Sequence, residues 1–224
     1  MLQSYIQKTR IENNLPVARE GLPFIIPELI ITILMFYWGI APAGMFLGLI
    51  TLFTIYFFRD PERTGNAGDD AVLSPADGTI IDIRYLEDGN NNLGRPALKI
   101  SVFMSVFNVH VNRIPVKGKI SGIKYNPGKF VSANLDKASE QNENNSIALE
   151  TLNGTRILFV QIAGLIARRI ACWIKEGDHV IAGQRFGLIR FGSRVDIYLP
   201  SESRINVRLK DRVKAGESVI GYLP

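Results

Sequence analysis

Hydrophobic and polar residues follow two different patterns along the chain. Residues 24–58 form an almost unbroken apolar run in which Glu28 is the only charged residue. From residue 71 onward, short runs rich in β-branched and aromatic residues alternate with glycine-containing turns, as in GTIIDIRYL, GKISGIKY and TRILFVQIA. The second pattern is typical of strands in which alternate side chains face a core. It predicts an N-terminal apolar segment followed by a mainly β domain of Greek-key or sandwich type.

The apolar run is too long for one comfortable membrane-spanning helix. As a single helix it would measure about 52 Å, whereas the hydrocarbon core of a bilayer is about 30 Å thick. The stretch IAPAG offers a break at Pro42 and Gly44. It predicts two helices over 28–40 and 45–58, each about 20 Å long. We expect a tight hairpin that spans the bilayer with local thinning or dips into one leaflet.

Two other interpretations of this segment fit less well. A signal peptide would end near APA, but the apolar run resumes at once and more than twenty residues precede it. A hairpin buried in a soluble fold would need further helical faces to cover it, and none is predicted. Basic residues flank the segment at Lys8, Arg10, Arg19, Arg59 and Arg63. By the positive-inside tendency, both flanks and the main domain are expected on the cytoplasmic side of the cell membrane.

Composition shifts and turn residues set the expected domain boundaries. They are an N-terminal segment 1–23, the hairpin 24–58, a polar linker 59–70 and the β domain 71–224. Within the domain, the polar stretch 131–146 is expected to be a long loop, and QIAGLIARRIACWI fits either a helix or a strand pair.

A faint internal repeat refines the expected fold class. GDHVIAGQRFGLI and KDRVKAGESVIGYL share an acidic residue, a valine two positions on and an Ala-Gly pair. Hairpins with such turns are similar to those of the lipoyl/biotinyl barrel-sandwich family, and SPADGTII resembles a strand opening of the same folds. The expected fold is therefore a mainly β, barrel-sandwich, lipoyl-like domain preceded by an apolar helical hairpin.

Charge and composition narrow the classes of partner. The net charge is +5 and the pI is about 9.4, but no basic run with interleaved aromatics occurs, so a nucleic-acid partner is not expected. With an apolar segment present, the positive charge favours an anionic phospholipid membrane. The single cysteine, Cys172, excludes an internal disulfide and is most simply a small core residue. No cysteine–histidine pair has the spacing of zinc ligands, so no metal site is expected.

Of the two histidines, His110 is the candidate for chemistry. In FNVHVNRIP the valines take the apolar phase, which leaves Asn108, His110 and Asn112 together on the other face of a strand. Amides two residues away can hold a histidine in a chosen tautomer; a purely structural, hydrogen-bonded histidine is the alternative. His179, in the turn EGDHV, is expected to be exposed.

A serine occupies an apolar position of the strand RFGSRVDIYLP. Ser193 falls in phase with the hydrophobic residues that follow it and comes directly after Gly192. The sequence FGSRV lacks the second glycine of a G-x-S-x-G elbow, so a plain serine hydrolase fits poorly. A serine in a tight turn can instead attack the preceding carbonyl and shift the acyl group from nitrogen to oxygen. Glycine leaves that carbonyl unhindered, and elimination followed by hydrolysis would convert the serine into a pyruvoyl group.

Several motifs together resemble the short form of the phosphatidylserine decarboxylase proenzymes, a pyruvoyl-dependent family. They are FGSRVDIYLP, SPADG, FMSVFNVHVNRIPVKG, the loop LDKASEQNENNS and the apolar hairpin. The resemblance covers nearly the whole chain. It implies self-cleavage between Gly192 and Ser193 into a β chain, 1–192, and an α chain, 193–224, whose first residue becomes a covalent pyruvoyl group.

The resemblance also implies an activity and a site. The pyruvoyl carbonyl would form a Schiff base with a phosphatidylserine-type lipid, whose decarboxylation yields phosphatidylethanolamine. Asp77 and His110 are expected to remove the proton from the Ser193 hydroxyl, and His110 to protonate the later carbanion. Asp77 also has a structural explanation, because Asp-Gly turns open many strands. Longer members carry a second histidine three residues after the first, where this chain has Arg113.

Weaker candidates for substrate contacts complete the set. Arg190 and Arg194 are candidates for the lipid phosphate, because guanidinium favours bidentate phosphate contacts, and Asn108 and Asn112 for other groups. The main alternative is a membrane-tethered lipoyl-like binding module without catalysis, although only Lys214 lies beside an Ala-Gly turn. The sequence leaves open the lipid backbone, the depth of the hairpin in the bilayer, homo-oligomer formation, and the division of labour between Asp77 and His110.

Overall fold

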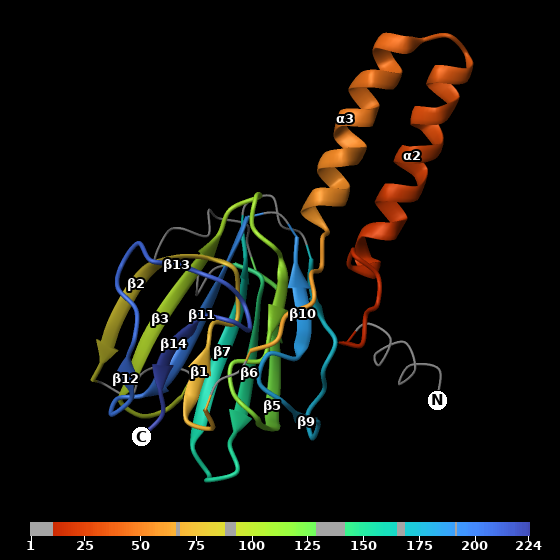
Figure 1. The fold of residues 1–224 in the computed structure, drawn as a ribbon. Helices are drawn as coiled ribbons and strands as arrows, with labels where there is room; N and C mark the ends of the chain where they lie inside the picture. The colour runs from red at the N-terminus through yellow and green to blue at the C-terminus, as the bar shows by residue number, and fades with distance from the viewer. Residues whose placement is uncertain (1–10, 66–67, 88–92, 129–141, 165–168, 191) are drawn as a thin grey trace. The chain divides into compact units, whose positions relative to one another are not determined.

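The computed structural model describes residues 11–65, 68–87, 93–128, 142–164, 169–190 and 192–224. The chain forms two compact units, residues 1–62 and 63–224 (Figure 1). The first contains an apolar helix pair and the second is built of antiparallel strands, so the predicted division into helical and mainly β parts is confirmed.

The helix pair consists of α2 (Leu22–Tyr37), preceded by the short 3-10 helix η1 (Arg19–Gly21), and α3 (Ala41–Phe57). The predicted break at Pro42 and Gly44 is wrong by a few residues. Gly39 ends α2 with a φ of +76°, and Ile40 N–H donates to Met35 O at 2.9 Å in the manner of a Schellman cap. Pro42 lies in the first turn of α3, where its missing N–H costs nothing.

The two helices are short and apolar on their outer surfaces. With 16 and 17 residues they measure about 24–26 Å, less than the hydrocarbon thickness of a bilayer. Where they meet, the hydroxyls of Thr32 and Thr51 lie 3.3 Å apart. Large apolar side chains such as Ile33 and Leu49 are more than half exposed. The stretch Arg19–Tyr37, with a mean hydropathy of 1.6, has the length and composition of a membrane span.

The second unit contains three antiparallel sheets in its described residues. The largest has the strand order β13-β2-β3-β11-β7-β6-β5-β9, and the smaller two are β1-β14-β12 and β4-β10-β8. Figure 1 shows the large sheet as a strongly curled layer. The strands are β1 Ala71–Leu73, β2 Gly78–Leu86, β3 Ala97–Met104, β4 Val111–Arg113, β5 Gly118–Asn126, β6 Asn144–Glu150, β7 Arg156–Ala163, β8 Ile170–Cys172, β9 His179–Val180, β10 Arg185–Ile189, β11 Ser193–Pro200, β12 Arg204–Ile205, β13 Arg212–Val213 and β14 Val219–Tyr222.

Several predicted segments change in detail. GTIIDIRYL coincides with β2, whereas the long run 96–116 is divided by a turn between β3 and β4 in which Asn108 N–H donates to Ser105 O. Of the expected loop 131–146, residues 131–141 lie outside the described residues and 144–146 begin β6. QIAGLIARRIACWI contributes strands β7 and β8 in its described part.

The internal repeat in the sequence corresponds to a structural repeat. Strands β2 and β5 each have nine residues, begin at Gly78 and Gly118 and shift register after Ile80 and Ile120. Each pairs with a two-residue strand, β13 or β9, that precedes an Ala-Gly turn. The repeat extends to SPADGTI and IPVKGKI, a similarity that sequence analysis missed because little more than a proline, a glycine and an isoleucine are shared.

The two Ala-Gly turns meet at the centre of this repeat. Gly183 N–H donates to Ile114 O at 2.8 Å, and Gly216 N–H donates to Ser74 O at 2.9 Å. Both glycines have positive φ, at +79° and +71°. A Cβ on Gly216 would lie 2.7 Å from Arg113 Cδ and 3.3 Å from Gly183 Cα. The packing of the Gly183 turn against the Gly216 turn therefore brings the segment that precedes β2 next to the end of β4.

Replacement of Gly216 tests how closely the two Ala-Gly turns pack. Gly216→Ala is expected to lower stability by more than Gly154→Ala, which has a similar φ of +76° but nothing within 4 Å of an added Cβ. Left-handed backbone strain alone costs about 1–2 kcal/mol, and only Gly216→Ala adds steric overlap. Thermal unfolding of the full chain in detergent measures both, and equal losses would contradict close packing of the two turns.

Candidate active site

Ser193 lies at the start of β11 with its side chain fully buried. Its hydroxyl makes no hydrogen bond to any described residue, an uncommon state for a buried polar atom. The preceding Gly192 has a φ of +58°, and a Cβ there would meet nothing within 4 Å. The glycine is thus required by the left-handed backbone rather than by lack of space. The structure combines a buried hydroxyl that has no partner among the described residues with a left-handed backbone at the glycine before it.

Neighbouring strands define which side chains share the face of Ser193. In β11, Ser193 pairs with Met104 of β3 on one side and with Ala163 of β7 on the other. Because directly opposed residues of an antiparallel sheet share a face, Met104 and Ala163 lie beside Ser193. Two residues further along β11, Val195 pairs with Gln161 of β7. The predicted apolar phase of Ser193 is therefore confirmed.

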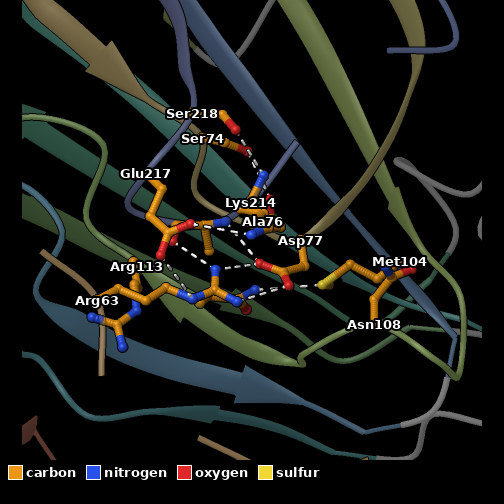
Figure 2. A network of polar contacts seen from close by, with 12 residues as sticks. Arg63, Ser74, Ala76, Asp77, Met104, Asn108, Arg113, Lys214, Glu217 and Ser218 are labelled. Carbon is orange, nitrogen blue, oxygen red and sulfur yellow. Dashed lines mark hydrogen bonds and ion pairs between the residues drawn. The ribbon is translucent and has the colours of Figure 1, made fainter. Parts of the chain in front are cut away.

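Asp77 is held in a buried ion pair one residue before β2. Arg63 donates from Nη1 to Asp77 Oδ1 and from Nη2 to Oδ2, the latter at 2.9 Å, and Ala215 N–H donates to Oδ1 at 2.8 Å. The side chains of Arg63 and Asp77 are only 6% and 10% exposed. Figure 2 shows Arg63 between Asp77 and Glu217, whose carboxylate lies 3.9 Å from Arg63 Nε. Both Asp77 oxygens therefore have charged or polar donors.

Asp77 and Ser193 approach the same region from different strands. Thr79 of β2 pairs with Phe103, the neighbour of Met104 in β3. Because β3 lies between β2 and β11, the two strands are about 10 Å apart. In Figure 2 the Met104 side chain extends toward the Asp77 carboxylate. The hydrogen bonds and ion pairs of Asp77 involve Arg63 and Ala215 among the described residues, not Ser193.

His110 is fully buried immediately before β4. Its Nδ1 lies 3.0 Å from Asn108 O. Because a carbonyl oxygen only accepts, Nδ1 must carry the proton, and in the neutral ring Nε2 then has the lone pair. Ile189 N–H, at the end of β10, donates to His110 O at 3.4 Å. The histidine thus has the tautomer of a general base and lies opposite a residue four positions before Ser193.

The two asparagines differ from the prediction in their placement. Asn108 lies in a turn and not on a strand face, and its side chain accepts hydrogen bonds from Ser105 N–H and Oγ–H. Its backbone carbonyl, not its amide, contacts His110. Asn112 lies in β4 and is fully buried, with Nδ2 3.6 Å from Met104 Sδ and Oδ1 accepting from Gln161 Nε2 at 2.8 Å.

The structure separates the two candidate arginines. Arg194 is 1% exposed and lies on the face of β11 opposite to Ser193, with Nε 2.8 Å from Asp196 Oδ1. Asp196 also lies 3.4 Å from Lys99 Nζ. The structure therefore does not bring Arg194 together with Ser193. Arg190, half-buried after β10, precedes the turn to Ser193.

The family model described as phosphatidylserine decarboxylase matches residues 50–221. A phosphatidylserine decarboxylase proenzyme of Syntrophus aciditrophicus is 51% identical over 207 residues, covering 92% of this chain and 96% of the relative. Proenzymes of Geobacter metallireducens and Desulfotalea psychrophila are 47% and 48% identical, each covering 95% of this chain and 99% of the relative. The chain belongs to the phosphatidylserine decarboxylase family.

Three residues at the site of this family member escaped sequence analysis. Arg63 was counted among the basic flanks of the apolar segment, yet its guanidinium is bound to Asp77 within the second unit. Gln161 and Asn145 stand in strand patterns that give no sign of their mutual hydrogen bond at 3.1 Å. Burial raises the pKa of the Cys172 thiol, and the Asn145 amide opposes that rise.

Removal of the Arg63 guanidinium is expected to destabilise the β unit strongly. Arg63→Met leaves the buried Asp77 carboxylate without its ion pair, a loss of about 3–5 kcal/mol. Lys117→Met is a matched control, because Lys117 occupies the position equivalent to Asp77 in the repeat and pairs with the 86%-exposed Asp69. Its expected cost is about 1 kcal/mol or less. Denaturant unfolding of the full chain measures the loss of unfolding free energy in each variant. Equal losses would contradict a stabilising ion pair at Asp77.

Proposed function

We propose that this chain is a self-processing, pyruvoyl-dependent decarboxylase that converts phosphatidylserine to phosphatidylethanolamine. The observation that carries the proposal is the buried, unengaged Ser193 hydroxyl directly after left-handed Gly192. Relatives about 50% identical over more than nine-tenths of the chain are named phosphatidylserine decarboxylase proenzymes. The residues present fit a group made from Ser193 itself, because the position is enclosed and its hydroxyl has no hydrogen-bond partner among the described residues.

Self-processing begins with the Ser193 hydroxyl. Its oxygen attacks the Gly192 carbonyl carbon, the peptide C–N bond breaks, and an ester joins the two residues. Abstraction of the Ser193 α-proton then breaks the Cβ–O bond, which releases a carboxylate at Gly192 and leaves a dehydroalanine. Water replaces its nitrogen, with loss of ammonia. A pyruvoyl group supplies a carbonyl that reacts with the substrate amine and accepts the electrons left when carbon dioxide departs.

His110 and Asp77 are assigned to proton transfer. The Nδ1–H contact with Asn108 O leaves Nε2 of His110 as a base suited to accept the Ser193 hydroxyl proton. Asp77, fixed by Arg63 and Ala215, is assigned to assist His110 in removing the Ser193 proton. In decarboxylation, His110 is the group that returns a proton to the substrate carbon.

The sheet topology explains how the two product chains remain one enzyme. Strand β11 lies between β3 and β7, and the fragment 193–224 also supplies β12, β13 and β14. Main-chain ladders on both sides of β11 therefore hold the small α chain to the larger β chain after the bond is cut. The matched halves around the Ala-Gly turns support assignment of the β unit to the barrel-sandwich class.

The apolar helix pair suits a lipid substrate. A diacyl lipid leaves the bilayer reluctantly, so an enzyme acting on its headgroup gains from attachment to an anionic membrane surface. Exposed apolar side chains of α2 and α3 are suited to that attachment. The basic residues before α2 and after α3 support an assignment of the β unit to the cytoplasmic side of the cell membrane. Arg190 is assigned to the lipid phosphate in this arrangement.

Ser193→Ala tests self-processing directly. The wild-type chain is expected to yield two fragments, 1–192 and 193–224, the smaller carrying the mass of an N-terminal pyruvoyl group, while Ser193→Ala stays intact. Intact mass spectrometry of the purified proteins distinguishes these states. A single unmodified wild-type chain, folded and bound to vesicles, would refute the proposal and favour a tethered binding module.

The two histidines form a matched pair for testing the base. His110→Asn can keep the hydrogen bond to Asn108 O but has no second ring nitrogen, and is expected to slow cleavage by about 100-fold or more. His179→Asn changes an exposed side chain and is expected to leave the rate unchanged. The rate is followed as the appearance of fragment 193–224 during cell-free synthesis with lipid vesicles. Normal cleavage of His110→Asn would remove His110 from this step.

A further inference from the structure

A chain of buried amides lies on the Ser193 face, between the large sheet and the β4-β10-β8 sheet. Asn145 Nδ2 donates to Gln161 Oε1 at 3.1 Å, and Gln161 Nε2 donates to Asn112 Oδ1 at 2.8 Å. All three residues are at most 2% exposed. They come from β6, β7 and β4, so the chain links the two sheets beside the cleavage strand.

The direction of this chain is fixed by its last member. Asn112 Nδ2 contacts Met104 Sδ at 3.6 Å, and a thioether accepts hydrogen bonds but donates none. A reversed chain would place the Asn112 oxygen against the sulfur, with no hydrogen bond between them. The relay through Asn145 and Gln161 therefore holds the Asn112 carboxamide with its amino group toward Met104.

Met104 is the cross-strand partner of Ser193, so the Asn112 amino group lies against a side chain that neighbours Ser193. Among the described residues, its partner is the sulfur, which is a weak acceptor. An amide nitrogen has two hydrogens, and a fully buried one normally uses both. Asn112 thus has a donor to spare, and only Met104 links it to a buried serine whose hydroxyl also has no partner among the described residues.

Attack of Ser193 on the Gly192 carbonyl creates a negative oxygen in this buried region. Preorganised hydrogen-bond donors aimed at such an oxygen stabilise it strongly in a site that excludes water. We propose that Asn112 donates a hydrogen bond to the oxyanion of the acyl shift, and that Gln161 and Asn145 are positioning residues that orient its amide. This inference rests on the proposed self-processing reaction and assigns a step within it.

Gln161→Glu tests the orientation with almost no change of shape. A carboxylate at 161 still accepts from Asn145 but cannot donate to Asn112, so the Asn112 amide is expected to turn its oxygen toward Ser193. Loss of one oxyanion donor slows a reaction by about 100- to 1,000-fold. We expect that decrease in the cleavage rate for Gln161→Glu and for Asn112→Asp, measured by intact mass during cell-free synthesis of the full chain with vesicles.

Two controls separate this role from a loss of folding. Gln184→Glu is a matched variant elsewhere, because Gln184 Oε1 only accepts a hydrogen bond from Ile181 N–H, and its rate is expected to equal wild type. In Gln161→Glu, protonation of the carboxyl restores a donor toward Asn112. The ratio of its rate to the wild-type rate should therefore rise as pH falls, a dependence that a merely structural defect would not produce.

Hydroxylamine identifies the step that is slowed. It cleaves esters but not peptide bonds under mild conditions, so it releases fragment 193–224 only from chains that have completed the acyl shift. If Asn112 stabilises the oxyanion, both slow variants resist hydroxylamine. Rapid release would mean that the ester had accumulated and would overturn the inference, as would wild-type rates in both variants. If wild type itself is never cleaved, the proposed function fails first and this inference with it.

Discussion

The pairing of β11 with strands on both sides is the constraint on which the site depends. It fixes Ser193 between Met104 and Ala163 and determines which face of the sheet carries the Ser193 hydroxyl. A slip of one residue would exchange that face with the one occupied by Arg194. Such a slip would carry Arg194 and Asp196 together to the other face and separate Asp196 from Lys99 of β3, its cross-strand ion-pair partner. The charged face of β11 thus protects the register that the neutral face needs.

The two faces of the large sheet contain different kinds of buried polar group. The sheet face opposite to Ser193 carries the Arg194–Asp196 pair and its neighbour Lys99. On the Ser193 face the amides of Asn112 and Gln161 are neutral, and the Arg63–Asp77 ion pair lies further away, before β2. A buried charge costs far more than a hydrogen-bonded amide and polarises whatever lies near it. Neutral donors can stabilise a charge that forms during reaction without binding a permanent counter-ion. This separation suits a site whose reacting group begins as an uncharged peptide.

Sequence patterns predicted local features well and distant contacts poorly. Alternation in RVDIYLP placed Ser193 correctly, and the glycine before it indicated the unusual backbone. The helix break was misplaced because Pro42 was interpreted as a helix breaker, although proline is well tolerated in a first turn. Arg63 binds Ala215, 152 positions away, and Gln161 binds Asn112, 49 positions away. Contacts between residues so far apart in the sequence produce no hydrophobic periodicity, so the sequence pattern could not predict them.

The proposed cleavage after Gly192 would distribute the structural repeat over two polypeptides. The turn at Gly183 stays on the larger chain and the turn at Gly216 goes to the smaller one, although the two pack against each other. The intact precursor can fold as a single molecule, but the mature pair can regain its structure only by a bimolecular encounter. Maturation would then be irreversible for two reasons: the peptide bond is cut, and unfolded chains that separate must find each other again before they can refold. The working lifetime of the enzyme is set by its rate of opening rather than by a folding equilibrium.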